Sequence, residues 1–337
     1  MKKVIFTICS NNYLAKAKTL GDSILAYNPD YEFFIFLCDS KLSDVDYGRF
    51  MNFSLNEISV LNIEKFKDMS ERYNIIELNT SIKPFCFNYL LNVLNFDFVF
   101  YLDPDICLFD NLSYIEEKLE DNDIILTPHI CTPIPFDGLR ANENDFAQYG
   151  LYNLGFLAVK KSHAAQELVD WWMERLEVNC YIRPQEGIFV DQLPINLAPI
   201  FFDNVYITKH LGLNAAPWNL HERNIYNTNG TWTVNNEFPL IFFHFSNFNI
   251  NFSQGNLSTA YQRVNLKRND ELYALYEWYR NKLLENDHTY FSQLAYHYNT
   301  PNTQAKPSPK TPAKPKTRFK SFIKRILSVF HKKKSSQ

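Results

Sequence analysis

The sequence predicts an α/β fold around a largely parallel central sheet. Short apolar segments alternate with segments of helical spacing, the order typical of β-α-β units. The first apolar segment, residues 3–10, is rich in Val, Ile and Phe, which indicates a strand covered on both faces. The 337 residues are 46% hydrophobic and 16% aromatic, so the chain can bury a large core and is not a disordered protein.

The elements follow from apolar runs and from turn residues. The predicted strands end at polar or turn-forming residues, and they cover residues 3–10, 31–38, 58–63, 98–102, 123–127, 152–160 and 239–245. The predicted helices have apolar residues three or four positions apart, and they cover residues 14–27, 82–94, 112–119, 162–177 and 270–284. Residues 185–219 lack either pattern, which predicts a region rich in loops.

The formal net charge of −3 is the sum of two unlike parts. Residues 301–337 contain nine Lys, two Arg and no acidic residue, a charge of +11. Residues 1–300 then hold 23 basic and 37 acidic groups, a net charge of −14. An acidic body argues against nucleic acid as a partner, because phosphate binding needs a basic surface.

The basic end of the chain divides into two segments. Five prolines in residues 301–316 predict an extended linker that follows a domain over residues 1–300. Residues 317–337 have apolar positions at 319, 322, 323, 326, 327 and 330, which form one face of a basic amphipathic helix. Such a helix favours binding to an anionic membrane surface. A helix for a partner protein and an RNA-binding tail are the alternatives. No apolar run approaches the ~20 residues of a membrane-spanning helix.

The strongest local motif is Asp103-Pro104-Asp105 at the end of the strand predicted at 98–102. In an extended chain residues i and i+2 point to the same side, so both carboxylates can converge on one cation. Oxygen ligands suit Mg²⁺ or Mn²⁺, and the carboxyl ends of strands are where open α/β sheets bind ligands. The alternative is a turn that caps the following helix. Glycine-rich dinucleotide and P-loop motifs are absent from the sequence.

A set of motifs in order resembles the nucleotide-sugar glycosyltransferases of the GT-A fold. It is most similar to glycosyltransferase family 8 and to bacterial enzymes that extend lipopolysaccharide or lipooligosaccharide glycans. The resemblance covers roughly residues 1–250. It rests on six segments: 6–13, 101–106, 152–156, 190–192 (with Asn196), 214–219 and 243–246. It implies a Rossmann-like GT-A domain with a mostly parallel sheet.

The resemblance also assigns donor and metal ligands. It implies that Asp103, Asp105 and His244 bind Mn²⁺ or Mg²⁺, although a lone His on an apolar strand is often structural. Residues of the donor site would be Thr7, Asn12 and Tyr13 for the base, with Lys83, Asp103, Asn153 and Gly155 for the diphosphate and sugar. For Tyr13 core packing is the alternative, and for Lys83 it is a solvated lysine at a helix start.

The catalytic and acceptor residues are also implied by the resemblance. Asp191 would hold sugar hydroxyls, and Gln192 would stabilise the transition state at the anomeric carbon, with retention of configuration. The alternative for Asp191 is a helix N-terminal residue. The acceptor side would be formed by Asn214, Trp218, Asn219 and Arg223. After His244 the chain lacks the glycine and lysine that family 8 usually carries, so Lys83 or Lys209 would replace that lysine.

These expectations combine into one hypothesis. The chain would be a metal-dependent hexosyltransferase that uses a nucleotide-diphosphate sugar, most simply a UDP-sugar, and a lipid-linked, lipopolysaccharide or capsule glycan acceptor. It would lie in the cytoplasm, peripheral to the inner face of the cell membrane. The alternatives are a non-catalytic, membrane-tethered scaffold on a degenerate GT-A fold and a sugar nucleotidyltransferase. The latter usually has a glycine-rich, basic first loop, which residues 9–13 lack.

Overall fold

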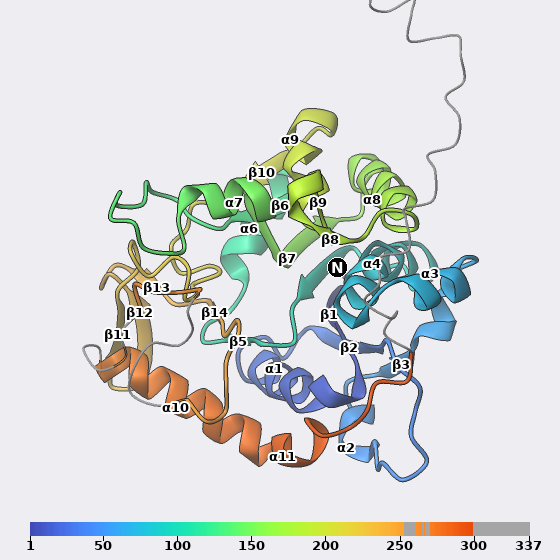
Figure 1. Cartoon of the computed structure of the whole chain (residues 1–337), viewed down its shortest axis with the longest axis horizontal. Coiled ribbons are helices and arrows are strands. Elements are labelled where there is room, and N and C mark those ends of the chain that lie inside the picture. The colour runs from blue at the N-terminus through green and yellow to red at the C-terminus, as the bar shows by residue number, and fades with distance from the viewer. Residues whose placement is uncertain (253–259, 265, 267–269, 299–337) are drawn as a thin grey trace, which may run out of the picture. The chain divides into compact units, whose positions relative to one another are not determined.

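A seven-stranded sheet lies at the centre of the fold, in the order β10-β6-β7-β4-β1-β2-β3 (Figure 1). All neighbouring strands are parallel except β7, which is antiparallel to both β4 and β6. The prediction of a mostly parallel sheet is therefore confirmed. The strands are β1 (Lys3–Cys9), β2 (Glu32–Leu37), β3 (Leu55–Glu57), β4 (Phe98–Leu102), β6 (Ile124–Pro128), β7 (Tyr152–Lys160) and β10 (Val205–Ile207).

Helices cover both faces of the sheet, because successive side chains of a strand point to opposite faces. In β1, Val4 and Phe6 join one core while Ile5 joins the other. The first core is completed by α4 (Ile75–Ser81), α5 (Lys83–Asn88), the π-helix η3 (Tyr89–Val93) and α8 (His163–Leu176). The second is completed by α1 (Leu14–Tyr27), α2 (Gly48–Met51) and α6 (Ser113–Asp121).

A second layer of strands carries the chain back to the end of β4. The short strand β5 (Ile106–Leu108) pairs antiparallel with β14 (Phe242–His244). A separate sheet contains β11 (Ile225–Thr228), β12 (Thr231–Val234) and β13 (Phe238–Pro239). In Figure 1, α10 (Asp270–Glu285) runs from β11 to α1, and α11 (His288–Phe291) packs beside α1. This layer brings residues of the second half of the chain to the carboxyl end of β4.

The computed structural model describes residues 1–252, 260–264, 266 and 270–298. The linker predicted at 301–316 and the amphipathic helix predicted at 317–337 lie outside these residues. Within them, no helix is both long enough and apolar enough to cross a membrane.

One prediction of secondary structure is wrong, and another is refined. Residues 58–63 were expected to form a strand, but Ile58–Leu61 is a 3-10 helix, η2, and the edge strand is β3, at Leu55–Glu57. The region predicted to be rich in loops, residues 185–219, also contains short elements. They include β9 (Ile188–Phe189), α9 (Ala198–Phe201) and β10. Strand β9 forms a hairpin with β8 (Ile182–Arg183), which lies just before the region. The remaining elements are η1 (Asn11–Tyr13), α3 (Phe66–Arg72), α7 (Glu143–Tyr149), η4 (Pro184–Glu186) and η5 (Leu193–Leu197).

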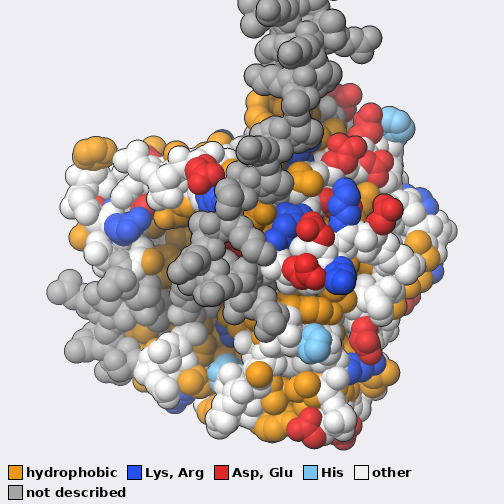
Figure 2. Space-filling view, turned by 45° about the vertical axis from the view of Figure 1, so that its right-hand side comes forward, with side chains coloured by type: hydrophobic (Ala, Val, Ile, Leu, Met, Phe, Trp, Pro, Cys, Tyr) orange, Lys and Arg blue, Asp and Glu red, His pale blue; other side chains and the backbone are white. Residues whose placement is uncertain are grey.

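The surface carries both signs of charge. Figure 2 shows Lys and Arg side chains interspersed with Asp and Glu on the face that it displays, with hydrophobic side chains between them. On this face the described residues form no continuous positive patch, which is the feature that phosphate backbones require.

Candidate active site

Asp103-Pro104-Asp105 forms the turn between β4 and β5. The backbone N–H of Asp103 donates to the carbonyl of Gly155 on β7 (2.8 Å), and the N–H of Phe245 donates to the carbonyl of Asp105 (2.8 Å). These bonds fix the turn between two strands that lie far away in the sequence. The pairing of β14 with β5 places His244 opposite Ile106, directly beside the two aspartates.

Asp103, Asp105 and His244 form a compact group of potential metal ligands. His244 Nε2 lies 3.1 Å from Asp105 Oδ1 and 3.8 Å from Asp103 Oδ2. One ligand atom from each residue lies within 4.8 Å of the others. Two carboxylate oxygens and one imidazole nitrogen are a donor set that fits Mn²⁺ or Mg²⁺ and leaves positions for a ligand. The residues present therefore fit the metal that the sequence analysis expected.

The ionisation of this group depends on its members. Burial would raise the pKa of Asp105, but His244 and Lys16 outweigh it, so the pKa of Asp105 is lowered. Burial would lower the pKa of His244, but Asp105 and Asp103 outweigh it, so the pKa of His244 is raised. The carboxylates therefore favour the protonated form of the His244 imidazole over the neutral form more than water does. A metal ion would have to displace this proton, which makes binding pH-dependent.

Gly155 leaves room for His244. A Cβ atom at this position would lie 2.5 Å from His244 Cε1 and 2.8 Å from Asn153 Oδ1. Asn153 in turn lies against the ring, with its Oδ1 3.3 Å from His244 Nδ1. A hydrogen bond to the second ring nitrogen orients a metal-binding imidazole. Gly155 and Asn153 were expected to contact the donor, and the structure places both at the cavity and against His244.

A cavity of about 1030 Å³ opens in front of the metal-ligand group. It is large enough for a nucleotide-sugar-sized ligand. Ten of the predicted site residues line it: Tyr13, Lys83, Asp103, Asp105, Asn153, Gly155, Asp191, Gln192, Trp218 and His244. Tyr13 is 39% exposed, so its ring is not core packing.

Lys83 and Asp191 form a buried ion pair in the wall of the cavity. The Lys83 side chain is 2% exposed and the Asp191 side chain 3%. Lys83 Nζ donates to Asp191 Oδ2 and to the Leu154 carbonyl (2.8 Å), and it lies 4.0 Å from the centre of the Tyr101 ring. Burial raises the pKa of Asp191, and the Lys83 ammonium opposes that shift. The alternative of a solvated Lys83 is wrong, and its ammonium is already supplied with acceptors.

Gln192 is held by the backbone around it. Its Oε1 accepts from the Leu154 N–H (3.1 Å), and its Nε2 donates to the Tyr149 carbonyl (2.7 Å). Val190, just before the pair, has a φ of 36°, a conformation that β-branched residues rarely adopt. Strained backbone of this kind is often found at functional sites.

Several predicted residues do not line the cavity. Thr7 is completely buried, and its hydroxyl has no hydrogen-bond partner among the described residues. Asn12 accepts from the Ser10 hydroxyl (2.5 Å). Lys209 is exposed and lies outside the lining.

Three of the predicted acceptor residues form a buried network instead. Asn219 Nδ2 donates to the carbonyls of His129 and Asn214 (both 3.0 Å), and Arg223 donates to the Asn214 carbonyl (3.1 Å). The network holds the turn that presents Trp218, whose ring lies 5.1 Å from that of His244, edge to face. Among these four residues, Trp218 is the one in a position to meet an acceptor.

The structure adds cavity residues that the sequence analysis did not identify. Lys16 follows Tyr13 by three residues on η1 and α1, a helical spacing that places both side chains on one face. His129, Phe146, Tyr149, Tyr261 and His288 also line the cavity. Only Lys16 had a signal in the sequence, its spacing from Tyr13.

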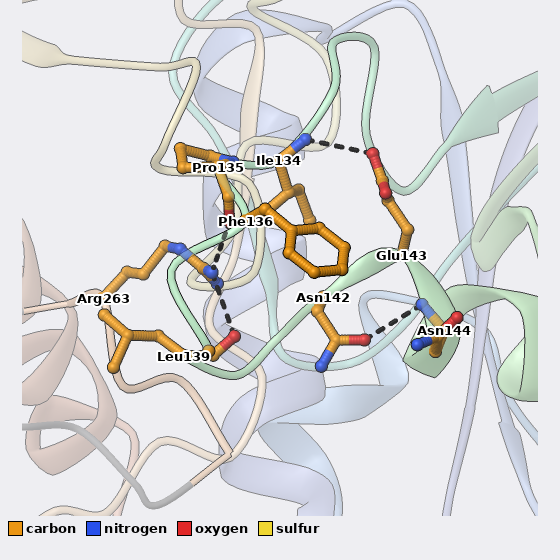
Figure 3. Close-up of a pocket in the computed structure, with 9 residues that line it drawn as sticks. Ile134, Pro135, Phe136, Leu139, Asn142, Glu143, Asn144 and Arg263 are labelled. Atoms are coloured by element: carbon orange, nitrogen blue, oxygen red, sulfur yellow. Dashed lines mark hydrogen bonds between the residues drawn. The ribbon is translucent and has the colours of Figure 1, made fainter.

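A smaller hollow of about 130 Å³ lies in the loop that forms one wall of the cavity (Figure 3). Arg263 reaches across it and donates to the Leu139 carbonyl (2.9 Å), and it pairs with Asp137. The Ile134 N–H donates to Glu143 (3.2 Å) at the other end of the loop. Arg263 therefore positions the loop whose residues Arg140 and Ala141 face the main cavity.

Comparison with known proteins gives similarities at two levels. No family model matches the chain. Two uncharacterized proteins of Bacillus subtilis (strain 168) are similar in sequence: YfnF is 26% identical over 74% of this chain and 83% of its own length, and YfnD is 24% identical over 72% and 77%.

Solved structures of glycosyltransferases are similar in fold. A structure of the galactosyltransferase LgtC, in complex with donor and acceptor sugar analogs, is 18% identical, covers 83% of this chain and 99% of its own, and has a TM-score of 0.46. The structure of the glycosyltransferase GlyE of Streptococcus pneumoniae TIGR4 is 13% identical. The match covers 91% of this chain and 66% of GlyE, with a TM-score of 0.47. Membership of glycosyltransferase family 8 stays a prediction.

Proposed function

We propose that the chain is a metal-dependent glycosyltransferase that uses a nucleotide-diphosphate sugar. The observation that carries the proposal is the Asp103, Asp105 and His244 group, which faces a cavity of about 1030 Å³. A bound divalent cation would neutralise the diphosphate and make it a better leaving group. The two carboxylates and the imidazole would hold that cation at the end of β4.

The other residues of the cavity would position the two substrates. The exposed ring of Tyr13 offers a face on which a base can stack. Gln192 is fixed by two backbone contacts, so its amide is preorganised to stabilise positive charge at the anomeric carbon. Trp218 offers a flat surface to the acceptor sugar. This arrangement supports attack from the side of the leaving group, with retention of configuration.

The finer assignment rests on the sequence motifs. It includes a hexose, a UDP-linked donor, Mn²⁺ as the metal and a lipid-linked, lipopolysaccharide or capsule glycan as the acceptor. Residues 317–337 would attach the enzyme to an anionic membrane surface at the inner face of the cell membrane. Attachment would raise the local concentration of a lipid-linked acceptor.

The activity is tested by a screen of nucleotide sugars for Mn²⁺-dependent binding and slow hydrolysis. Wild type is compared with Asp103→Asn and Asp105→Asn, and Asp121→Asn, exposed at the end of α6, is the matched control. We expect wild type and Asp121→Asn to bind and hydrolyse one donor, and both site variants to lose at least ~100-fold, as for loss of a charge-stabilising group. Equal behaviour of all four proteins, or no donor bound by wild type, would reject the proposal and favour a scaffold.

The tail is tested separately with liposomes that contain anionic lipid. The full-length chain should co-sediment with them, and the chain truncated after Thr300 should stay in solution. Binding should weaken at high salt because charge attraction contributes to it. Unchanged co-sedimentation after truncation would refute the anchor.

A further inference from the structure

Lys16 places a positive charge beside the metal-ligand group. It lies near the start of α1, and its side chain is 9% exposed. Its Nζ is 3.8 Å from Asp105 Oδ2 and 4.1 Å from the centre of the Tyr13 ring. The side chain lines the main cavity together with both of these residues. The Lys16 ammonium thus lies close to both the Tyr13 ring and a carboxylate of the metal-ligand group.

Among the described residues, the ammonium of Lys16 forms an ion pair with Asp105 but no hydrogen bond. A separation of 3.8 Å exceeds hydrogen-bond length, and among the described residues no hydrogen bond from Lys16 Nζ is formed. An ammonium carries three donors, and because Lys16 lines the cavity, these donors are open to a ligand that enters it. Two other lysines of this region are satisfied: Lys83 by Asp191 and Leu154, and Lys18 by Asp22 at 3.0 Å. The Lys16 ammonium can therefore donate hydrogen bonds to an anionic ligand that enters the cavity.

Charge balance indicates which acceptor fits. Two carboxylates, a neutral His244, a divalent cation and Lys16 sum to a net charge of +1. Lys16 and the cation would repel each other across Asp105 unless an anion lay between them. A diphosphate supplies oxygens for both, because it can coordinate a metal and accept from an ammonium at once. The base attached to it would then extend toward Tyr13.

We propose that Lys16 binds the diphosphate of the nucleotide-sugar donor. The proposal rests on the proposed function and adds to it the residue that completes the charge of the donor site. Lys16 would contribute to ligand affinity only when the phosphates are present. For the metal alone it is an unfavourable neighbour. Lys16 would thus raise the affinity for the diphosphate and lower the affinity for the metal alone. A lysine that only supports the fold would affect both affinities in the same direction.

The test compares Lys16→Met with the matched control Lys18→Met on the same helix. Calorimetry measures binding of Mn²⁺ alone and then of UDP, GDP and ADP at saturating Mn²⁺. We expect Lys16→Met to bind the preferred nucleoside diphosphate about 10- to 100-fold more weakly, the range of a lost charge-assisted hydrogen bond. The same variant should bind Mn²⁺ alone as tightly as wild type or more tightly. Lys18→Met should match wild type in both measurements.

Two outcomes would overturn the proposal without touching the proposed function. One is equal nucleotide affinity of Lys16→Met and wild type. The other is a parallel loss of nucleotide and Mn²⁺ affinity, which would show a structural role. If wild type binds no nucleoside diphosphate with Mn²⁺, the proposed function is itself overturned, and the role of Lys16 falls with it.

Discussion

Two groups of charged side chains lie in the same cavity and differ in how far their charges are satisfied. The closed pair, Lys83 and Asp191, is almost completely buried, and each charge has its partner within the protein. The open group, Asp103, Asp105, His244 and Lys16, has its carboxylates 16–30% exposed to the cavity and a lysine without hydrogen bonds among the described residues. Apart from Lys16, the members of both groups were expected at the donor or metal site.

The difference separates charges that are balanced inside the protein from charges that face the cavity. In the closed pair each charge balances the other, and removal of either partner would leave a buried charge. In the open group the carboxylates and the Lys16 ammonium face the cavity, so a metal and an anion would gain contacts there. Lys83 and Asp191 line the same cavity, and their contact with a donor stays a prediction.

The largest expected effect comes from breaking the closed pair. Lys83→Met should lower the free energy of unfolding by about 3–5 kcal/mol, because Asp191 would be left buried and unpaired. The double variant Lys83→Met/Asp191→Leu should recover much of that loss. Urea denaturation measures both. Lys118→Met, which removes a surface pair with Glu117, serves as the control and should leave the free energy of unfolding close to that of wild type. A Lys83→Met protein as stable as wild type would show that the pair is not closed.

An intermediate effect is expected from the open group, and only when a metal is added. Mn²⁺ at about 100 times its dissociation constant should stabilise wild type by ~2.7 kcal/mol. Asp105→Asn should lose this stabilisation, because one of three ligands becomes a neutral amide. Thermal unfolding with and without Mn²⁺ measures the difference. Asp121→Asn should keep the full metal shift. A metal shift retained in Asp105→Asn would place the ion elsewhere.

Features that depend on neighbouring residues could be predicted from the sequence. Asp103 and Asp105 lie one residue apart at the end of an apolar strand, so the sequence indicated that both carboxylates can share one cation. In the structure they lie on the turn between β4 and β5, which brings both of them to His244. The central strands were predicted because long apolar runs mark them, whereas β3 and β10 are short and half-buried and leave no such run. The position of β7, antiparallel within the sheet, depends on long-range pairing.

Contacts between distant segments could not be predicted from local patterns. Lys83 and Asp191 are 108 residues apart, and Arg263 lies 124 residues from Leu139. Their pairing depends on how the second half of the chain folds back over the sheet. His244 was expected at the metal through its motif resemblance, and its distance from the aspartates agrees with that expectation.

The smallest effect concerns two histidines on either side of Asn153. His244 belongs to the open group and has a raised pKa, because Asp105 and Asp103 outweigh its burial. His129 is buried against Phe146 and Trp218, and burial lowers its pKa to about 3. Asn153 lies 3.3 Å from a ring nitrogen of each. The open group therefore favours a charged imidazole and the packed region a neutral one.

This difference gives a pH dependence of defined sign. Because the folded-state pKa of His129 is depressed, its contribution to stability is complete above the unfolded pKa near 6.5 and is lost as pH falls toward 3. The maximum slope for one group is about 1.4 kcal/mol per pH unit. His129→Gln, which stays neutral and keeps an amide near Asn153, should show a shallower loss of stability between pH 6 and 4 than wild type. Urea denaturation at several pH values measures both slopes, and equal slopes would mean that His129 titrates normally in the folded protein.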